Sequence, residues 1–283
     1  MDSVDSTNAR FQRIFFDSVV RGAEIMTEAN RVVQDFNSSH PLMQKASKVE
    51  YGQEALSAST FYLGAAANSL QALQLATVGP KPSEAIATGN VTIHITINGT
   101  CGLLRQILES AAIAKWAVSS PTDEDLMSRG FSITWANAIE SVKHSNSLTS
   151  PNLPRLKSDL NALIQDGRRL NLMVERPKSS LGWEPRYSMV DTSGLLRARK
   201  LPNDLIAHYR ETLGPGSENA EWLYRWLSGM AHGLPWVIEL TMQDEPAEIM
   251  TGFTKPNYFR LALSAFAGVE LIEEVIKMMY REA

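Results

Sequence analysis

The chain has 283 residues, of which 44% are hydrophobic and 20% charged, and its formal net charge is −4. This composition is too apolar for a disordered protein, and the single cysteine, Cys101, excludes a disulfide scaffold and a cysteine-rich metal site. The excess of acidic residues argues against non-specific coating of a nucleic acid. It does not exclude a local basic patch on the surface.

The first residues are acidic and polar and do not form the basic segment of a secretory leader, so we expect a cytoplasmic protein. Two uncharged stretches, 55–80 and 85–104, are long enough to span a bilayer. Both contain several Ser, Thr, Asn or Gln residues, and no basic cluster flanks either one. We therefore interpret them as buried elements of a soluble protein, with no membrane partner.

Apolar residues recur at helical spacing through most of the chain. A first helix is expected over residues 7–36, with Phe11, Ile14 and Phe15 on its apolar face. A second is expected over residues 42–77, and its later half is rich in Ala and Ser, which lets a neighbouring helix approach closely. Gly79 and Pro80 then break the chain.

The stretch 91–98, Val-Thr-Ile-His-Ile-Thr-Ile-Asn, has two interpretations. Its β-branched alternation is typical of a strand. No second strand pattern of similar quality occurs elsewhere, and a lone strand cannot satisfy its own backbone groups. We therefore favour a buried helix from about residue 90 to residue 116, against local propensity.

Six further helical segments follow. Thr122 is expected to cap a helix whose first turn is acidic, and residues 151–176 form another. After a loop-rich interval with short helices near 189–199 and 202–213, Ser217 is expected to cap a helix that extends to Gly233. A C-terminal helix is expected over residues 256–281.

The sequence therefore predicts an all-α protein, a multi-helix bundle of about eight to ten helices in a single globular domain. The break near residue 80 suggests a division into an N-terminal helical hairpin, 1–80, and a main bundle, 81–283. The same pattern is compatible with one continuous domain.

No strong catalytic motif is present. The sequence contains no phosphate-binding Gly-rich loop, no nucleophile elbow, and no His pair at the spacing of a zinc site. The five histidines are scattered, and none belongs to the Glu-X-X-His pairs of a diiron bundle. We therefore expect no metal and no cofactor.

The densest group of unusual residues lies in the segment 221–236. On a helix, Tyr224, Ser228 and His232 are four residues apart and form one ridge, and Arg225 lies two turns from His232 on nearly the same face. Imidazole titrates near neutral pH and can exchange protons, and a guanidinium can bind a phosphate through two hydrogen bonds. The same side chains can equally satisfy one another inside a core.

A second group lies in the segment 105–116. Arg105 and Glu109 form an i,i+4 pair after about twenty uncharged residues, so they are expected to be partly buried and mutually paired. The pair is either a structural link between helices or part of the same polar pocket as His232. Arg129 is a further candidate for that pocket.

These residues carry two family resemblances. Arg105, Glu109, Trp116, Pro121 and Arg129-Gly130, followed by the Tyr-X3-Ser-X3-His-Gly segment at 224–233, resemble uncharacterised helical proteins common in actinobacteria. That resemblance covers roughly residues 95–240. It also favours a helix at 91–98.

The spacing Arg225-X6-His232 resembles the signature of HEPN domains, which are small helical bundles that are often dimeric. Many of them are metal-independent ribonucleases of toxin–antitoxin and phage-defence systems. This resemblance implies a homodimer that acts on RNA, with a possible protein antitoxin. It also implies that Arg225 binds the scissile phosphate and that His232 transfers protons.

Two hypotheses follow. In the first, the protein is a HEPN-like ribonuclease acting through Arg225 and His232. In the second, it is a non-catalytic helical protein whose polar ridge is structural or binds a small ligand or a protein partner. In both cases we expect the helix that carries the ridge to pack centrally against the helix that carries Arg105 and Trp116.

Overall fold

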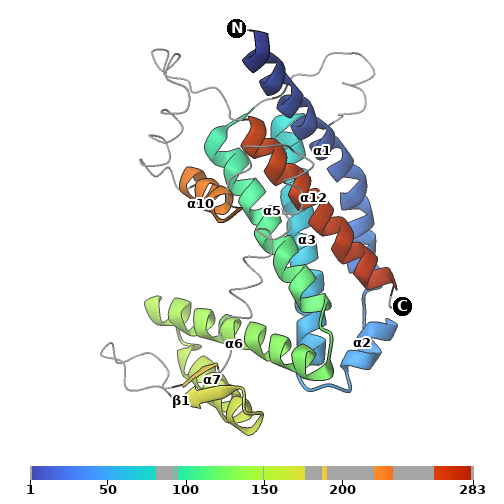
Figure 1. The fold of residues 1–283 in the computed structure, drawn as a ribbon. Helices are drawn as coiled ribbons and strands as arrows, with labels where there is room; N and C mark the ends of the chain where they lie inside the picture. The colour runs from blue at the N-terminus through green and yellow to red at the C-terminus, as the bar shows by residue number, and fades with distance from the viewer. Residues whose placement is uncertain are drawn as a thin grey trace.

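The computed structural model describes residues 2–80, 93, 95–148, 150–175, 187–189, 220–231 and 258–281. The architecture is an all-α bundle, as the sequence predicts (Figure 1). The described residues form eight helices: α1 (Asp2–Asp35), α2 (Pro41–Ala46), α3 (Gly52–Thr77), α5 (Ile97–Val118), α6 (Asp123–Ser147), α7 (Leu153–Arg169), α10 (Ala220–Ala231) and α12 (Tyr258–Arg281). None of these helices is both long enough and apolar enough to cross a membrane.

Four long helices form the central bundle, in which α1, α3, α5 and α12 are neighbours in that order around one core (Figure 1). Helices α1 and α3 are antiparallel, since Gly22 lies against Leu70 and Val33, later in α1, lies against Gly64, earlier in α3. Helix α12 runs parallel to α1, since Phe11 contacts Phe259 and Arg31 contacts Tyr280. Apolar side chains from all four helices form one continuous cluster.

Small residues set the distance between these helices. A Cβ added at Gly22 would lie 2.9 Å from the side chain of Leu70, and one added at Gly268 would lie 2.7 Å from Ile107. Ser59 is fully buried and donates a hydrogen bond of 2.8 Å to the carbonyl of Ala114, which joins α3 to α5. Small residues on α1, α3 and α12 thus allow close helix packing.

Ion pairs fasten α12 to both of its neighbours. Arg21 on α1 donates to Glu270 and Glu273, and Lys115 on α5 donates to Glu274. Burial lowers the pKa of the Arg21 guanidinium, but its hydrogen bonds to the two carboxylates outweigh that effect and leave the pKa raised. These contacts fix the position of α12 along the bundle.

The expected helix over residues 42–77 is in fact two helices, which corrects the sequence prediction. Helix α2 ends at Ala46, and α3 begins at Gly52 after Tyr51 adopts a left-handed conformation with φ of 60°. A Cβ at Gly52 would lie 2.5 Å from the carbonyl oxygen of Ala46, so only glycine permits this turn.

The expected helix from residue 90 is also shorter than predicted. Ile93, Ile95 and Thr96 are not helical, and α5 begins at Ile97 with Thr96 in an extended conformation. The β-branched side chains of this stretch disfavour a helix, and this local preference prevails over the argument from the missing partner strand. Residues 91, 92 and 94 lie outside the described residues.

Helices α6 and α7 form a second, smaller unit at one end of the bundle (Figure 1). Thr122 caps α6 as predicted, since its hydroxyl accepts a hydrogen bond of 3.1 Å from the backbone N–H of Asp125. The core of this unit is a cluster of five buried side chains: Phe131, Leu160, Leu163, Ile164 and Met173.

Helix α7 ends at Arg169, seven residues before the predicted end at Arg176. Asn171 has φ of 57°, and the N–H of Leu172 donates back to the carbonyl of Gly167, which completes a helix-terminating turn. The chain then forms strand β1 (Met173–Glu175), which pairs antiparallel with β2 (Tyr187–Met189). The sequence did not predict this pair of short strands.

The C-terminal helix agrees with its predicted range to within two residues. The short helices expected near 189–199 and 202–213 lie outside the described residues except for Met189, which belongs to strand β2, and the cap expected at Ser217 lies outside them as well. The proposed division near residue 80 stays a prediction, and the bundle core includes buried residues from both sides of it.

Candidate functional site

Helix α10 packs on the outer side of α5, so the predicted contact between these two helices is present (Figure 1). The predicted central position is wrong, because α10 lies at the edge of the four-helix bundle. Trp226, Leu227 and Met230 form the buried face of α10. A Cβ added at Gly102 of α5 would lie 3.8 Å from the Cβ of Ala231, so the two backbones approach closely there. Gly102 lies three residues, about one turn, before Arg105 on α5.

Ser228 is the described member of the expected polar ridge. It is half-buried, whereas Trp226, Leu227 and Met230 are fully buried, so it lies on the less buried side of α10. The side chains of Tyr224 and Arg225 and the whole of His232 lie outside the described part of the chain. Their roles stay predictions from the sequence.

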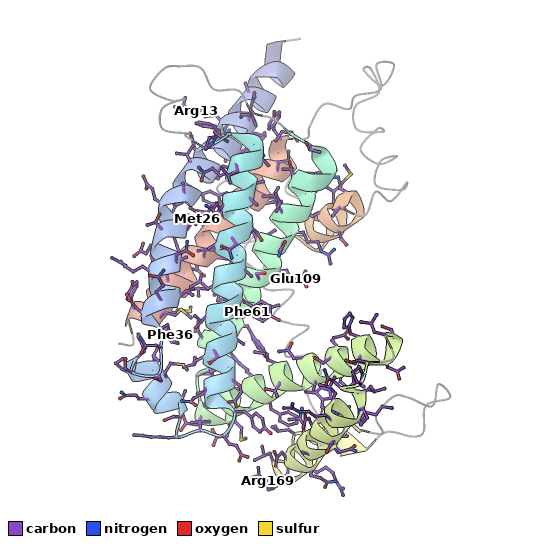
Figure 2. The ribbon with its side chains drawn as sticks, turned by 180° about the vertical axis from the view of Figure 1, so that it is seen from behind. Arg13, Met26, Phe36, Phe61, Glu109 and Arg169 are labelled. Carbon is purple, nitrogen blue, oxygen red and sulfur yellow. The ribbon has the colours of Figure 1, made fainter. Side chains whose placement is uncertain are left out.

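Arg105 and Glu109 form the expected ion pair on α5. The Nε of Arg105 lies 3.7 Å from Oε2 of Glu109, and the two side chains are 27% and 24% exposed. Figure 2 shows Glu109 on α5, behind the α3 helix that bears Phe61. The pair is therefore partly desolvated but still open to small molecules from solvent.

The ion pair lines a half-open cavity of about 280 Å³ between α5, α3 and the end of α10. Its described lining residues are Tyr62, Gly102, Arg105, Gln106, Glu109, Ser110, Ile113 and Ala231. A cationic, an anionic and several neutral polar groups thus meet at one cavity, and the residue that follows Ala231 in the sequence is His232.

Three of these polar residues were missed in the sequence. Gln106 and Ser110 are four residues apart and adjacent to the Arg105–Glu109 pair, so helical periodicity alone could have placed them on the same side of α5. Tyr62 comes from α3. No local pattern indicates which side chain of a distant helix reaches the cavity.

Arg260 is a further buried polar residue near α10. It is 6% exposed in the first turn of α12, and its guanidinium carbon lies 5.2 Å from the ring centroid of Trp226. This stacking on an aromatic face joins α12 to α10. In the sequence, Arg260 is the only charged residue between Lys255 and Glu270, which could have identified it.

Arg129 lies elsewhere, at the C-terminal end of α5. It donates to the carbonyl of Trp116, and its guanidinium carbon lies 5.4 Å from the centroid of the Trp116 ring. Burial lowers the pKa of Arg129, although Asp125 acts in the opposite direction. Its partner Trp116 is eleven residues, or about 16 Å along α5, from Arg105, and Arg129 is not among the described residues that line the polar cavity.

Among the described residues, no three His, Cys, Asp or Glu side chains gather closely enough to hold a metal ion. Cys101 is fully buried in α5, and burial raises the pKa of its thiol to about 12. Comparisons with protein-family models, with curated proteins and with solved structures found no match for this chain.

Proposed function

We propose that the protein is a metal-independent ribonuclease of the HEPN type, whose site lies where the C-terminal end of α10 meets α5. One observation supports this proposal above the others. The end of α10 borders a cavity of about 280 Å³ that is lined by a cationic side chain, an anionic side chain and several hydrogen-bonding groups. Position 232 follows directly in the sequence.

The proposed chemistry is transesterification within the RNA. The 2′-hydroxyl attacks the adjacent phosphorus, the bond to the 5′-oxygen breaks, and a 2′,3′-cyclic phosphate is formed. His232 exchanges the proton that the 2′-hydroxyl loses or that the leaving 5′-oxygen gains. Arg225 binds the non-bridging oxygens through charge-assisted hydrogen bonds. No metal ion is needed for this sequence of steps.

The test is cleavage of a labelled, unstructured RNA by the full chain in the presence of EDTA. We expect His232→Ala and Arg225→Ala to reduce the rate by roughly 10²–10⁴-fold, the usual contribution of an acid–base group. A matched control is His144→Ala, because His144 is exposed on α6. A DNA oligonucleotide of the same sequence should resist cleavage, since it lacks the 2′-hydroxyl.

Activity that requires magnesium, or that survives the loss of both Arg225 and His232, would contradict the proposal. So would equal cleavage of the DNA oligonucleotide. The circular dichroism spectrum and melting temperature of each variant should match the wild type, because a solvent-accessible catalytic side chain contributes little to packing.

A second candidate is a non-catalytic protein in which the polar ridge is structural or binds a ligand. The observation that favours it is the Arg105–Glu109 pair, because a partly buried i,i+4 ion pair on one helix can simply satisfy its own charges. In that case His232→Ala should cost roughly 1–3 kcal/mol of stability by leaving a buried partner unsatisfied. No RNA cleavage should then be detectable with any variant.

A further inference from the structure

Helix α3 has one side that no described element covers. The side consists of six residues that helical geometry places within a narrow arc, and we call it the α3 stripe. The stripe comprises Ser57, Phe61, Gly64, Asn68, Ala72 and Leu75. Phe61 is 71% exposed and Leu75 is 51% exposed, although the opposite side of α3 is fully buried in the bundle.

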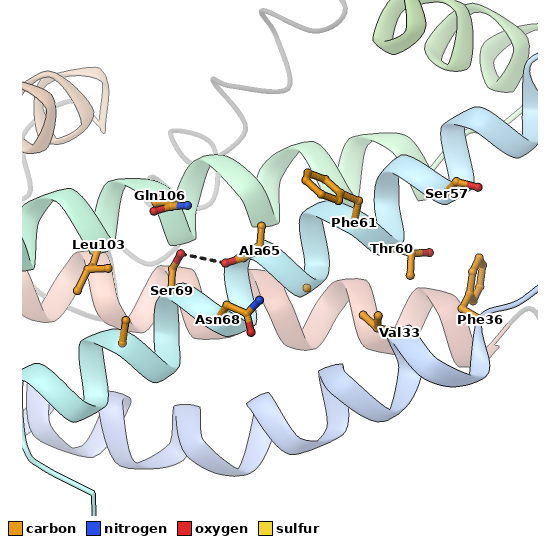
Figure 3. Close-up of a pocket in the computed structure, with 12 residues that line it drawn as sticks. Val33, Phe36, Ser57, Thr60, Phe61, Ala65, Asn68, Ser69, Leu103 and Gln106 are labelled. Atoms are coloured by element: carbon orange, nitrogen blue, oxygen red, sulfur yellow. Dashed lines mark hydrogen bonds between the residues drawn. The ribbon is translucent and has the colours of Figure 1, made fainter. Parts of the chain in front are cut away.

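Two grooves follow this stripe. One of about 720 Å³ extends from Val33 and Phe36 of α1 to Leu103 and Gln106 of α5 (Figure 3). The other, of about 650 Å³, lies between α3 and α6 and shares Ser57 and Phe61 with the first. Phe61 therefore stands as an exposed ridge between two hollows, which is an unfavourable arrangement for an aromatic ring in water.

The order of side chains along the stripe is self-complementary. Phe61 and Leu75 are each seven residues from Asn68, and Gly64 and Ala72 are each four residues from it. When two such helices pack antiparallel about a two-fold axis at Asn68, Phe61 of one copy meets Leu75 of the other and Gly64 meets Ala72. The large side chains thus face each other at the two ends, and the small ones allow close approach near the axis.

Charge favours the same arrangement. The sequence has no charged residue from 55 to 80, so antiparallel pairing places no charge in the centre of the contact. The dipoles of two antiparallel helices also attract each other.

We propose that a second copy of this chain docks on the α3 stripe and forms a two-fold symmetric dimer. Between residues 57 and 75 the stripe is about 27 Å long, and a helix is about 10 Å wide, so the helix pair alone would cover roughly 300 Å² per copy. A stable interface needs about 800 Å² per partner. In the proposed dimer, the walls of the two grooves, on α1, α5 and α6, must provide the additional surface that such a contact requires.

This proposal is independent of the ribonuclease, because the stripe lies on α3 and not on α10. Gln106 lines both the first groove and the polar cavity, so the cavity lies beside the proposed interface. The dimer would hold two such cavities at fixed positions related by the two-fold axis.

The first test is analytical ultracentrifugation of the full chain over a range of concentrations. We expect a species of twice the chain mass of 31.3 kDa that dissociates on dilution. Phe61→Asp should raise the dimer dissociation constant at least 100-fold, because it would bury two charges. Leu148→Asp is the matched control, since Leu148 is 64% exposed on the far unit and should leave the constant unchanged.

The second test measures register. Asn68→Cys should form an intermolecular disulfide under mild oxidation, because the two copies of residue 68 face each other at the axis. Ser57→Cys should not, because the two copies of residue 57 would lie about 33 Å apart in antiparallel helices. Cys101 is fully buried and does not interfere.

A monomer at tens of micromolar would overturn the proposal, as would a dimer that Phe61→Asp does not weaken. A dimer in which Ser57→Cys crosslinks as readily as Asn68→Cys would also overturn it, because that result indicates parallel helices.

Discussion

The central bundle and the α6–α7 unit are stabilised in different ways. In the bundle, apolar side chains of four long helices form one continuous cluster, so no single side chain accounts for much of it. Among the described residues, the core of the α6–α7 unit consists of five buried side chains. The smaller unit must therefore depend on each of its contacts more strongly than the bundle does.

The junction between the two regions is correspondingly specific. Tyr51, in its left-handed conformation, places its carbonyl oxygen against Gly130 of α6 and its ring at 5.2 Å from that of Phe131. Its hydroxyl donates a hydrogen bond of 2.9 Å to Asp166 on α7, and Arg169 binds Glu50 close by. The turn between α2 and α3 thus forms a contact surface for the α6–α7 unit.

The largest loss of folding stability is expected from Phe131→Ala. Phe131 is fully buried, and truncation of a core phenylalanine costs about 3–5 kcal/mol. We expect hydrogen-exchange protection to fall in α6 and α7 and to persist in the bundle. Leu148→Ala, at a site that is 64% exposed, is the control and should change stability by less than about 0.5 kcal/mol. A uniform loss of protection would mean that the two regions unfold as one.

The next largest loss of stability is expected at the contact between the α2–α3 turn and α6. A Cβ at Gly130 would lie 1.8 Å from the carbonyl oxygen of Tyr51, so Gly130→Ala must displace either α6 or the turn. We expect a loss of about 1–3 kcal/mol in chemical denaturation. The matched variant Gly102→Ala has ordinary contact at 3.8 Å and should instead stabilise the bundle by about 0.4–1 kcal/mol. Equal effects from both substitutions would contradict the close contact at Gly130.

The features that were predictable from the sequence are those determined locally. The all-α class, the Thr122 cap and the C-terminal helix follow from periodicity and from side chains near each helix end. The early end of α7 also had a local signal, because Asn171 is among the residues that tolerate a positive φ.

The remaining features depend on distant contacts. Gly52 is a local signal for the break between α2 and α3, but the position of the turn is also set by Gly130, which lies 79 residues after Tyr51 in the sequence. At the candidate site, Arg105 and Glu109 stood out as charges after an uncharged run, and their pairing was correctly expected. The contribution of Tyr62 to the cavity required the packing of α3 against α5.

The smallest effect is a pH dependence of folding stability at the start of α2. His40 caps α2, since its Nδ1 accepts a hydrogen bond of 3.3 Å from the N–H of Leu42, and its ring packs on Phe36. Burial lowers the pKa of His40, with Asp35 acting in the opposite direction. Because the folded pKa is below the unfolded value of about 6.5, the unfolded chain binds more protons as the pH falls below that value.

The contribution of neutral His40 is therefore complete above about pH 6.5 and is lost as the pH falls toward the lowered folded pKa. His40→Asn keeps a capping acceptor that does not titrate. Between pH 8 and pH 5.5, the wild type should lose up to about 1 kcal/mol more stability than this variant, the usual value of one cap. Equal losses in urea titrations of the two proteins at both pH values would mean that protonation of His40 does not disturb α2.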